Sequence, residues 1–419
     1  MLKRICSILL CVSLLFSFGL TFSASETSTE VSNPEVNKPL TEEQTAALWE
    51  YLECLRFNDN DELSKAVSTA FKFDVKSAVL MEATTGTVLY EYQRDEKLSP
   101  ASVTKVMTML LIMEAIDSGL ITTEDTVTAS EHACSMGGTQ IYLEVGEQMT
   151  VNDLLKAIAV PSANDAAVAM AEYIAGSEEE FVNRMNQKAK DLGMQHTNFT
   201  NCTGLFDDAN HETTAYDIAL MTKELVKYEK IYEYTKIWMD TLRNGEFGLS
   251  NTNKMLRTYS GMTGMKTGFT KISGYCFSGT AERDGMTLIV TIMGGTTSEA
   301  RFSASAKLLD YGFASYAIAK GGEIELSSVK VRKGRVEIAE VEVVGELHAV
   351  VPKGQEKLVE STVTLTEEIE APAPKGQQVG VVTYKIGDNT LQTCPIVLKE
   401  DVERCSIWDY FGRLICGLF

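Results

Sequence analysis

The first feature of the chain is an apolar stretch at its N-terminus. Residues 8–22 are almost uniformly apolar, Lys3 and Arg4 precede them, and small residues follow at 23–25. This order predicts a secretory signal peptide over residues 1–25. An uncleaved anchor is the alternative, because the apolar run is only slightly short for spanning a bilayer. Both alternatives place the body of the protein outside the cytoplasm.

Helical and strand patterns over residues 71–318 predict one large α/β (α+β) domain, preceded by a polar leader and a helix within residues 26–70. The best-marked helix has Ser99 as its N-cap and Pro100 at its first helical position, and it ends at Gly119. Further helices are expected at 151–160, 164–175, 178–192, 215–227 and about 300–311. Strands are expected at 77–81, 87–92 and within 262–295, where an Arg-Asp-Gly turn joins 274–282 to 286–293.

Beyond the glycine pair at 321–322, the pattern changes to short alternating strands. Residues 322–398 therefore predict a small all-β domain, a β-sandwich. The last segment, 401–419, predicts an amphipathic helix whose apolar face includes Ile407, Trp408 and Phe411. An aromatic-rich face at a chain end favours a helix lying in a membrane interface. The alternative is a helix packed on the body of the protein.

The composition excludes one large class of partners. With 419 residues, 44% of them hydrophobic, the chain can bury a sizeable core. Its formal net charge of −20 excludes nucleic acid as a partner, because binding phosphates needs a basic face. Of nine Cys, two lie in the predicted signal peptide, and the other seven show neither CxxC pairs nor a repeated spacing. We expect buried or free thiols rather than a disulfide or zinc framework.

A Ser-x-x-Lys motif begins the candidate chemistry. Ser102 and Lys105 share one face of the predicted helix, so the lysine amine can reach the serine hydroxyl. A serine hydroxyl is a weak nucleophile unless a nearby base takes its proton, and a buried lysine can have its pKa lowered enough to act as that base. A second Ser-x-x-Lys, Ser327 with Lys330, lies in an alternating strand pattern that separates the two side chains.

Two further motifs follow at 162–164 and 266–268. Ser162 and Asn164 can relay a proton and hold an amide, although an ordinary helix cap would have the same residue types. Lys266, Thr267 and Gly268 can bind a carboxylate and allow close approach of a substrate backbone, which an edge strand would pair with. A P-loop is excluded, because methionine stands where the glycine before the lysine is needed.

The order SxxK, SxN and KTG, with these spacings and structural settings, resembles the penicillin-binding proteins and serine β-lactamases. Within that group the chain is similar to the low-molecular-weight D-alanyl-D-alanine carboxypeptidases over nearly all of its mature length, including the segments 98–105, 162–166, 211–217 and 264–270. The resemblance implies a β-lactamase/transpeptidase-like catalytic domain with an antiparallel sheet and a helical subdomain. It also implies that the enzyme removes the terminal D-alanine of peptidoglycan stem pentapeptides, needs no cofactor, and is inhibited by β-lactams.

The same resemblance assigns roles residue by residue. Ser102 is the acylated nucleophile, and Lys105 is the general base. Ser162 passes a proton to the departing amine. The implied substrate-binding residues are Asn164, Lys266, Thr267, Gly268, Phe269 and Arg301. Among these, Asn164 holds the substrate amide, Thr267 and Arg301 hold its carboxylate, and Lys266 keeps Lys105 neutral. An ordinary surface arginine is the alternative for Arg301. The backbone N–H groups of Ser102 and Phe269 form the oxyanion hole.

The sequence departs from the family pattern at two positions and leaves rival functions open. Phe269 stands where some relatives carry histidine, and Ala163 stands where glycine is common. A β-lactamase shares all three motifs, but its deacylating base has no convincing equivalent here, because the glutamates at 178–180 suit the first turn of a helix better. A non-catalytic binding module on the same fold is the other rival. His211 and Glu212 begin an HExxH pattern that lacks its second histidine, so we expect no metal and a structural His211.

Overall fold

The computed structural model describes residues 73–205, 208–322 and 324–409. The predicted signal peptide, the leader helix and the end of the C-terminal helix lie outside these ranges. Within them, none of the helices has the length and apolar character needed to cross a membrane.

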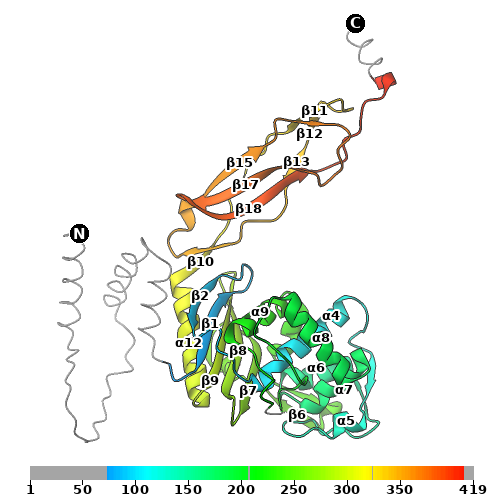
Figure 1. Ribbon diagram of the computed structural model, residues 1–419, viewed down its shortest axis with the longest axis vertical. Helices are drawn as coiled ribbons and strands as arrows, with labels where there is room; N and C mark the ends of the chain where they lie inside the picture. Colours follow the sequence, from blue (N-terminus) through cyan, green and yellow to red (C-terminus); the bar gives the residue numbers. More distant parts are fainter. Residues whose placement is uncertain (1–72, 206–207, 323, 410–419) are drawn as a thin grey trace, which may run out of the picture. The chain divides into compact units, whose positions relative to one another are not determined.

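A five-stranded antiparallel sheet forms the centre of the catalytic domain, in the order β2-β1-β9-β8-β7. Its strands are β1 (Ser77–Glu82), β2 (Val88–Tyr92), β7 (Met262–Thr270), β8 (Gly274–Arg283) and β9 (Met286–Gly295). Helix α12 (Ser298–Ser315) lies on one face and α9 (Ala215–Leu225) on the other (Figure 1). Covering both faces explains why every residue of β1 is buried. Strand β7, which carries the KTG motif, is an edge strand.

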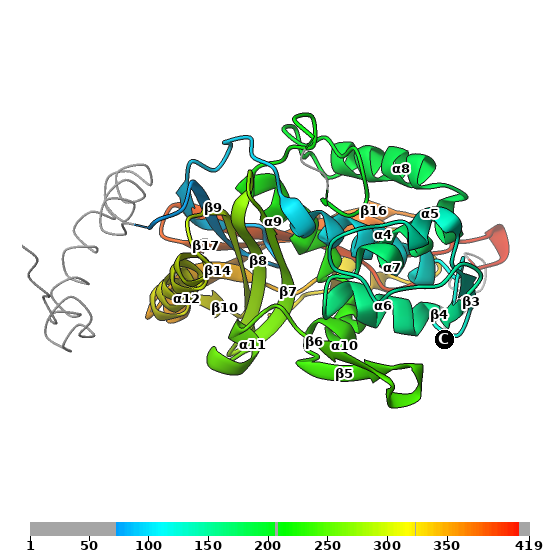
Figure 2. The ribbon, with the colours of Figure 1, turned by 90° about the horizontal axis from the view of Figure 1, so that it is seen from below.

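The helical subdomain faces the β7 edge of the sheet (Figure 2). It contains α4 (Lys105–Asp117), α5 (Glu131–Cys134), α6 (Val151–Ala159), α7 (Asn164–Ala175) and α8 (Glu178–Asp191). Helix α4 is buried on nearly every side, as expected for a helix that is apolar all round. Shorter elements are β3 (Thr126–Thr128), β4 (Gln148–Thr150), α10 (Tyr232–Thr235), β5 (Met239–Leu242), β6 (Phe247–Ser250) and α11 (Met255–Thr258).

Side-chain caps explain why several predicted helix starts are correct. The hydroxyls of Thr150, Ser177, Thr214 and Thr297 each accept a hydrogen bond from the backbone N–H three residues later. Each such cap stabilises a helix start by about 1 kcal/mol. The turn between β8 and β9 also forms as predicted, with positive φ at Asp284 and Gly285.

The predicted N-cap at Ser99 is wrong. The chain passes through a 3-10 turn, η1 (Ala101–Thr104), before α4 begins, and Pro100 occupies the cap position without a side-chain hydrogen bond. The Ser99 hydroxyl instead accepts a hydrogen bond from Ser273 Oγ at 2.8 Å. Contact with the β7–β8 turn therefore takes the group that would have capped the helix.

A separate all-β region follows α12. It contains β10 (Tyr316–Ala319), β11 (Val329–Arg332), β12 (Ile338–Ala339), β13 (Val341–Val343), β14 (Ala349–Pro352), β15 (Glu360–Leu365), β16 (Glu368–Glu370), β17 (Gln378–Ile386) and β18 (Asn389–Leu398). The strands form the sheets β12-β11-β16 and β13-β18-β17-β15 and the pair β10-β14. Their inward side chains, such as Val382 and Ile396, are fully buried and form a core of their own.

The helix predicted from residue 401 starts later than expected. Val402 pairs with Ala373 and Arg404 pairs with Gly334, so this stretch extends the β domain. Within the described part of this segment, residues 401–409, helical structure begins at 407, and Ile407 and Trp408 are 79% and 80% exposed.

Candidate active site

Ser102 and Lys105 meet as the motif predicts. The serine lies in η1 and the lysine is the first residue of α4, with 3.3 Å between Lys105 Nζ and Ser102 Oγ. Lys105 is completely buried, and burial lowers its pKa from 10.5 to about 7. A large fraction of the amine is therefore neutral at physiological pH and able to accept a proton.

The partners of Lys105 fix the direction of its lone pair. Nζ lies 2.6 Å from Asn164 Oδ1 and 2.9 Å from the carbonyl oxygen of Thr203, both of which can only accept hydrogen bonds. Asn164 is held in this orientation because its Nδ2 donates to the Gly137 carbonyl at 2.8 Å. A neutral amine uses both N–H groups on these two acceptors, which leaves its lone pair for the hydroxyl of Ser102.

Ser162 is held in a conformation that a simple helix cap would not need. Its φ is 77°, in the left-handed region that non-glycine residues rarely adopt. Helix α7 has Ala163 at the cap position, without a side-chain hydrogen bond. The buried Ser162 Oγ has no hydrogen-bond partner in the described part of the chain. A strained residue with an unused hydroxyl beside Asn164 favours chemistry over capping.

Lys266 brings a second amine to the site. It is 1% exposed, and its Nζ donates to the Thr267 carbonyl at 3.2 Å. Burial lowers the Lys266 pKa well below its ordinary value, and the charges of Lys105 and Arg301 lower it further. The two lysines are thus electrostatically coupled, and their mutual repulsion favours the state in which at least one is neutral.

Gly268 lets the β7 strand lie directly against the nucleophile turn. A Cβ at this position would lie 2.7 Å from the Pro100 carbonyl oxygen and 3.0 Å from the Ser102 nitrogen. No side chain fits there without moving the strand away from Ser102. Next to it, Thr267 Oγ1 hydrogen-bonds Thr252 Oγ1 at 2.6 Å, and the half-exposed Phe269 ring lies 4.3 Å from the ring of Tyr275.

Arg301 lies behind this strand. It projects from α12 and is 6% exposed. Its Nη1 donates to the carbonyls of Gly268 at 3.1 Å and Cys276 at 3.0 Å, and its Nη2 donates to Ser298 Oγ at 3.3 Å. The structure thus brings Ser102, Lys105, Asn164 and Gly268 together, whereas Arg301 is buried and bonded to backbone carbonyls, so it is not an ordinary surface arginine.

None of the sequence motifs indicated the segment 201–204, which contacts Lys105 through Thr203 and packs on Ala101 through Gly204. Asn201 Oδ1 accepts hydrogen bonds from the Thr203 N–H and hydroxyl and from the Gly204 N–H, which fixes the carbonyl that holds Lys105. A Cβ on Gly204 would lie 1.9 Å from the Ala101 carbonyl oxygen, so only glycine fits. Asparagine followed closely by glycine is a turn signal that was available in the sequence.

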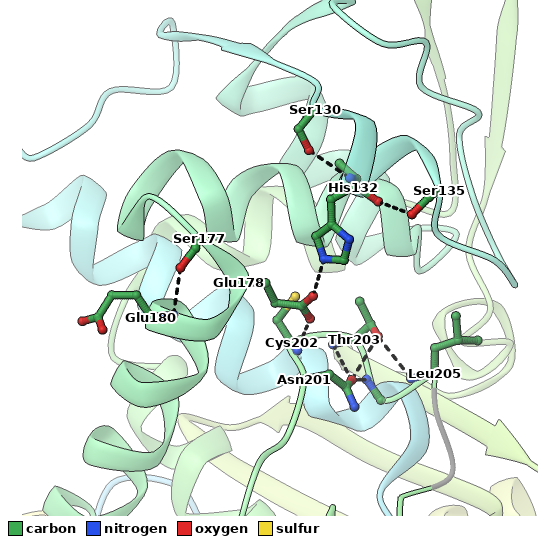
Figure 3. A network of polar contacts seen from close by, with 12 residues as sticks. Ser130, His132, Ser135, Ser177, Glu178, Glu180, Asn201, Cys202, Thr203 and Leu205 are labelled. Carbon is green, nitrogen blue, oxygen red and sulfur yellow. Dashed lines mark hydrogen bonds and ion pairs between the residues drawn. The ribbon is translucent and has the colours of Figure 1, made fainter.

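Glu178 anchors the same segment from outside (Figure 3). Its Oε1 accepts a hydrogen bond from the Cys202 N–H at 3.0 Å, and its Oε2 lies 2.8 Å from His132 Nε2. As predicted, Glu178 belongs to the first turn of α8, which Ser177 caps. Both carboxylate oxygens are engaged with protein groups, which distinguishes this residue from a base that activates water.

His211 supports the nucleophile turn from its other side. The Thr200 N–H donates to His211 Nδ1 at 3.0 Å, so the ring proton resides on Nε2, which lies 2.8 Å from Thr104 Oγ1. The threonine hydroxyl donates in turn to the Ala101 carbonyl at 2.8 Å. Burial lowers the His211 pKa to about 4, which keeps the ring neutral. The predicted structural role agrees with these contacts.

No group of three or more metal-ligating side chains occurs within the described ranges. The described cysteines, Cys134, Cys202, Cys276, Cys394 and Cys405, are all free thiols.

Comparison with known proteins shows which families and solved structures this chain is similar to. Residues 64–297 match the family described as D-alanyl-D-alanine carboxypeptidase, and residues 313–404 match the C-terminal domain of penicillin-binding protein 5. The chain is 43% identical to D-alanyl-D-alanine carboxypeptidase DacF of Bacillus subtilis over 347 residues, covering 81% of this chain and 89% of the relative. It is 34% identical to DacC of Escherichia coli, covering 81% and 86%. Penicillin-binding protein 5 of Haemophilus influenzae superposes with a TM-score of 0.70 at 30% identity, covering 80% of this chain and 99% of that one.

Proposed function

The chain belongs to the D-alanyl-D-alanine carboxypeptidase family, and we propose that it removes the terminal D-alanine of peptidoglycan stem peptides through an acyl-enzyme on Ser102. The family membership makes it a serine-type hydrolase that acts outside the cytoplasm. The observation that carries the residue assignment is the buried Lys105 amine, whose two acceptor contacts leave its lone pair for the Ser102 hydroxyl.

Acylation begins with proton transfer from Ser102 Oγ to Lys105 Nζ as the oxygen attacks the carbonyl carbon of the penultimate D-alanine. The resulting oxyanion accepts hydrogen bonds from the backbone N–H groups of Ser102 and Phe269. The peptide C–N bond then breaks. The departing D-alanine amine takes its proton through the Ser162 hydroxyl, which is replenished from Lys105. The products are free D-alanine and an ester on Ser102.

Deacylation reverses these roles with water as the nucleophile. Lys105, neutral again, takes a proton from water as the water attacks the ester carbonyl. The proton then passes to Ser102 Oγ as the ester bond breaks and the shortened peptide leaves. One residue can serve both steps because its lowered pKa lets it gain and lose a proton near neutral pH.

The substrate lies along the open edge of β7. An extended peptide can pair with this edge strand, and Gly268 allows its backbone to approach Ser102 closely. Asn164 Nδ2 and the backbone of β7 hold the substrate amides. The terminal carboxylate is held by the Thr267 hydroxyl, with the positive charges of Lys266 and Arg301 nearby.

Release of D-alanine from diacetyl-L-lysyl-D-alanyl-D-alanine tests this proposal. The purified protein should release D-alanine, and Ser102→Ala should abolish the release without changing the thermal melting temperature. Lys307→Met removes an exposed lysine from α12 and is the control for the effects of substitution and purification, so it should retain full activity. Unchanged release by the Ser102 variant would show that another residue is the nucleophile, and no release by the wild-type protein would favour a non-catalytic module.

A β-lactamase differs in how quickly its acyl-enzyme is hydrolysed. Because both carboxylate oxygens of Glu178 are engaged with Cys202 and His132, Glu178→Gln should leave the lifetime of a penicillin adduct within about twofold of wild type. A lifetime that lengthens by orders of magnitude would identify Glu178 as a deacylating base and favour the lactamase.

Export and membrane association complete the proposal. The signal-like segment 1–25 supports secretion, and the exposed Ile407 and Trp408 at the start of the last helix support a membrane contact. Deleting residues 406–419 should move the protein from the membrane fraction to the soluble fraction of the cell extract while leaving D-alanine release unchanged. Full-length protein found only in the soluble fraction would refute the membrane contact.

A further inference from the structure

The contacts of Arg301 converge on the peptide unit that completes the oxyanion hole. Its Nη1 donates to the Gly268 carbonyl on β7 and to the Cys276 carbonyl on β8, and these two residues are partners in the β7–β8 ladder. The guanidinium is nearly buried, and the rings of Tyr275 and Phe302 lie 5.4 Å and 4.4 Å from its central carbon. Its position is therefore fixed from several sides.

Peptide geometry relates this contact to the reacting atoms. In a planar trans peptide the carbonyl and the following N–H point in opposite directions. Because the Gly268 carbonyl points toward β8, the Phe269 N–H points toward the open edge of β7. The Gly268–Phe269 peptide lies next to the nucleophile turn, since a Cβ on Gly268 would lie 3.0 Å from the Ser102 nitrogen. The peptide that carries the Phe269 N–H is thus a neighbour of the Ser102 N–H, and Arg301 bonds the carbonyl end of that peptide.

We propose that Arg301 is a positioning residue that holds and polarises the Gly268–Phe269 peptide, and so strengthens the Phe269 N–H as a donor to the oxyanion. This inference rests on the proposed function. A cation hydrogen-bonded to a carbonyl draws electron density toward the oxygen and makes the N–H of the same peptide more positive. The effect grows as negative charge develops on the substrate oxygen, so it stabilises the transition state more than the bound substrate.

Arginine suits this role better than lysine. A planar guanidinium offers several donors in a fixed arrangement, and one nitrogen here serves two carbonyls while another contacts Ser298. Burial lowers the Arg301 pKa only to about 10, so the group remains charged at neutral pH. Direct binding of the substrate carboxylate, which the family resemblance implies for Arg301, is the rival role.

A pair of thioester substrates separates the two roles. Diacetyl-L-lysyl-D-alanyl thioglycolate carries a carboxylate on its leaving group, whereas the matching ethanethiol thioester has the same acyl part and no carboxylate. For Arg301→Met we expect the second-order acylation rate constant to fall about tenfold for both, because the oxyanion hole serves both. Arg301→Lys, which keeps the charge with fewer aligned donors, should recover part of the rate on both substrates.

Controls keep the outcomes distinct. Lys307→Met removes another positive charge from α12 and should acylate at the wild-type rate. Melting temperatures of all variants report folding, and the fraction of protein labelled by penicillin at long times reports competent sites. A loss confined to the carboxylate-bearing thioester would overturn the proposal in favour of carboxylate binding. Equal rates for Arg301→Met and wild type, or a loss that Arg301→Lys does not recover at all, would overturn it too. Failure of the wild-type protein to acylate at all would refute the proposed function first.

Discussion

Replacing Lys105 with methionine should remove activity while relieving a pH-dependent cost to stability. Lys105 is fully buried, and its pKa falls from 10.5 to about 7 on folding. Because the Lys105 pKa is lower in the folded state than in the unfolded state, at pH below 10.5 the amine must either lose its proton on folding or be buried as a charge. Because each pKa unit corresponds to 1.36 kcal/mol, this costs about 4 kcal/mol of folding free energy at pH 7 and about 2 kcal/mol at pH 9.

The variant also loses three hydrogen bonds, and it leaves Asn164 Oδ1 and the Thr203 carbonyl without their donor. Each unsatisfied acceptor costs about 1–3 kcal/mol, so the net stability change at a single pH is a poor test. That cost does not change with pH, whereas the ionisation cost does. The stability of Lys105→Met relative to wild type should therefore be greater at pH 7 than at pH 9, by about 2 kcal/mol.

Urea denaturation of both proteins at the two pH values measures this quantity, with Lys307→Met as the control for removing an exposed lysine from a helix. Lys266 is present in both proteins, and loss of the Lys105 charge raises the Lys266 pKa in the variant, which changes the relative stability in the same direction. Labelled penicillin should acylate wild type and the control but not Lys105→Met. A stability difference that is equal at both pH values, or acylation of the variant at the normal rate, would refute the reasoning that the base is a buried neutral amine.

Three further predictions test neighbouring parts of the site. Ser162→Gly should raise the melting temperature, because glycine relieves about 1 kcal/mol of strain at φ 77°. The same variant should slow acylation by penicillin by about 10²-fold or more, and an unchanged rate would exclude the proton relay. Gly268→Ala should slow acylation on the order of 10²-fold, because the added Cβ would lie 2.7 Å from the Pro100 carbonyl oxygen and would force β7 away from Ser102. Acylation at the wild-type rate would show that this close approach is unnecessary. His211 has a pKa of about 4 in the folded protein against 6.5 in the unfolded chain, so the unfolded chain binds a proton more readily as pH falls from 6.5 to 4. The free energy of unfolding should therefore fall by about 3 kcal/mol over this interval. Urea midpoints for wild type and His211→Gln should converge over that interval, and a constant gap would contradict the assignment.

The three motifs could be located from the sequence because their spacing has a local cause. Ser102 and Lys105 stand one helical turn apart, so a local periodicity brings their side chains together wherever that turn lies in the fold. Strand β7 could be expected from its pattern, and the glycine of the KTG motif already indicated a close backbone approach. What the sequence could not show is that this approach is to the Ser102 turn itself, because that contact joins residues far apart in the chain.

The segment 201–204 shows most clearly what could not be predicted from the sequence. Thr203 holds Lys105 through a backbone carbonyl, and a backbone group leaves no side-chain signature in the sequence. The start of the nucleophile helix was misplaced for a related reason. Ser99 has the right side chain for a cap, but its hydroxyl bonds Ser273 across the fold, and a tertiary contact therefore overrides the local preference.

The contacts of Arg301 could not be predicted from the sequence either. The family resemblance implies that Arg301 binds the substrate carboxylate. The packing of α12 against β8 determines which of its neighbours receive its hydrogen bonds, and the structure directs them to Gly268 and Cys276. The coordinates show which backbone groups Arg301 contacts, and the pair of thioester substrates separates substrate binding from an effect through the Gly268–Phe269 peptide.

The most direct test of the acyl-enzyme is to trap it and map the modified residue. Intact-protein mass measurement after brief exposure to penicillin, followed by proteolysis and peptide sequencing, gives both the stoichiometry and the site. We predict a long-lived adduct of one penicillin per protein, located on Ser102 and absent from Ser102→Ala. An adduct on a different residue, or D-alanine release that continues after Ser102 is replaced, would contradict the account.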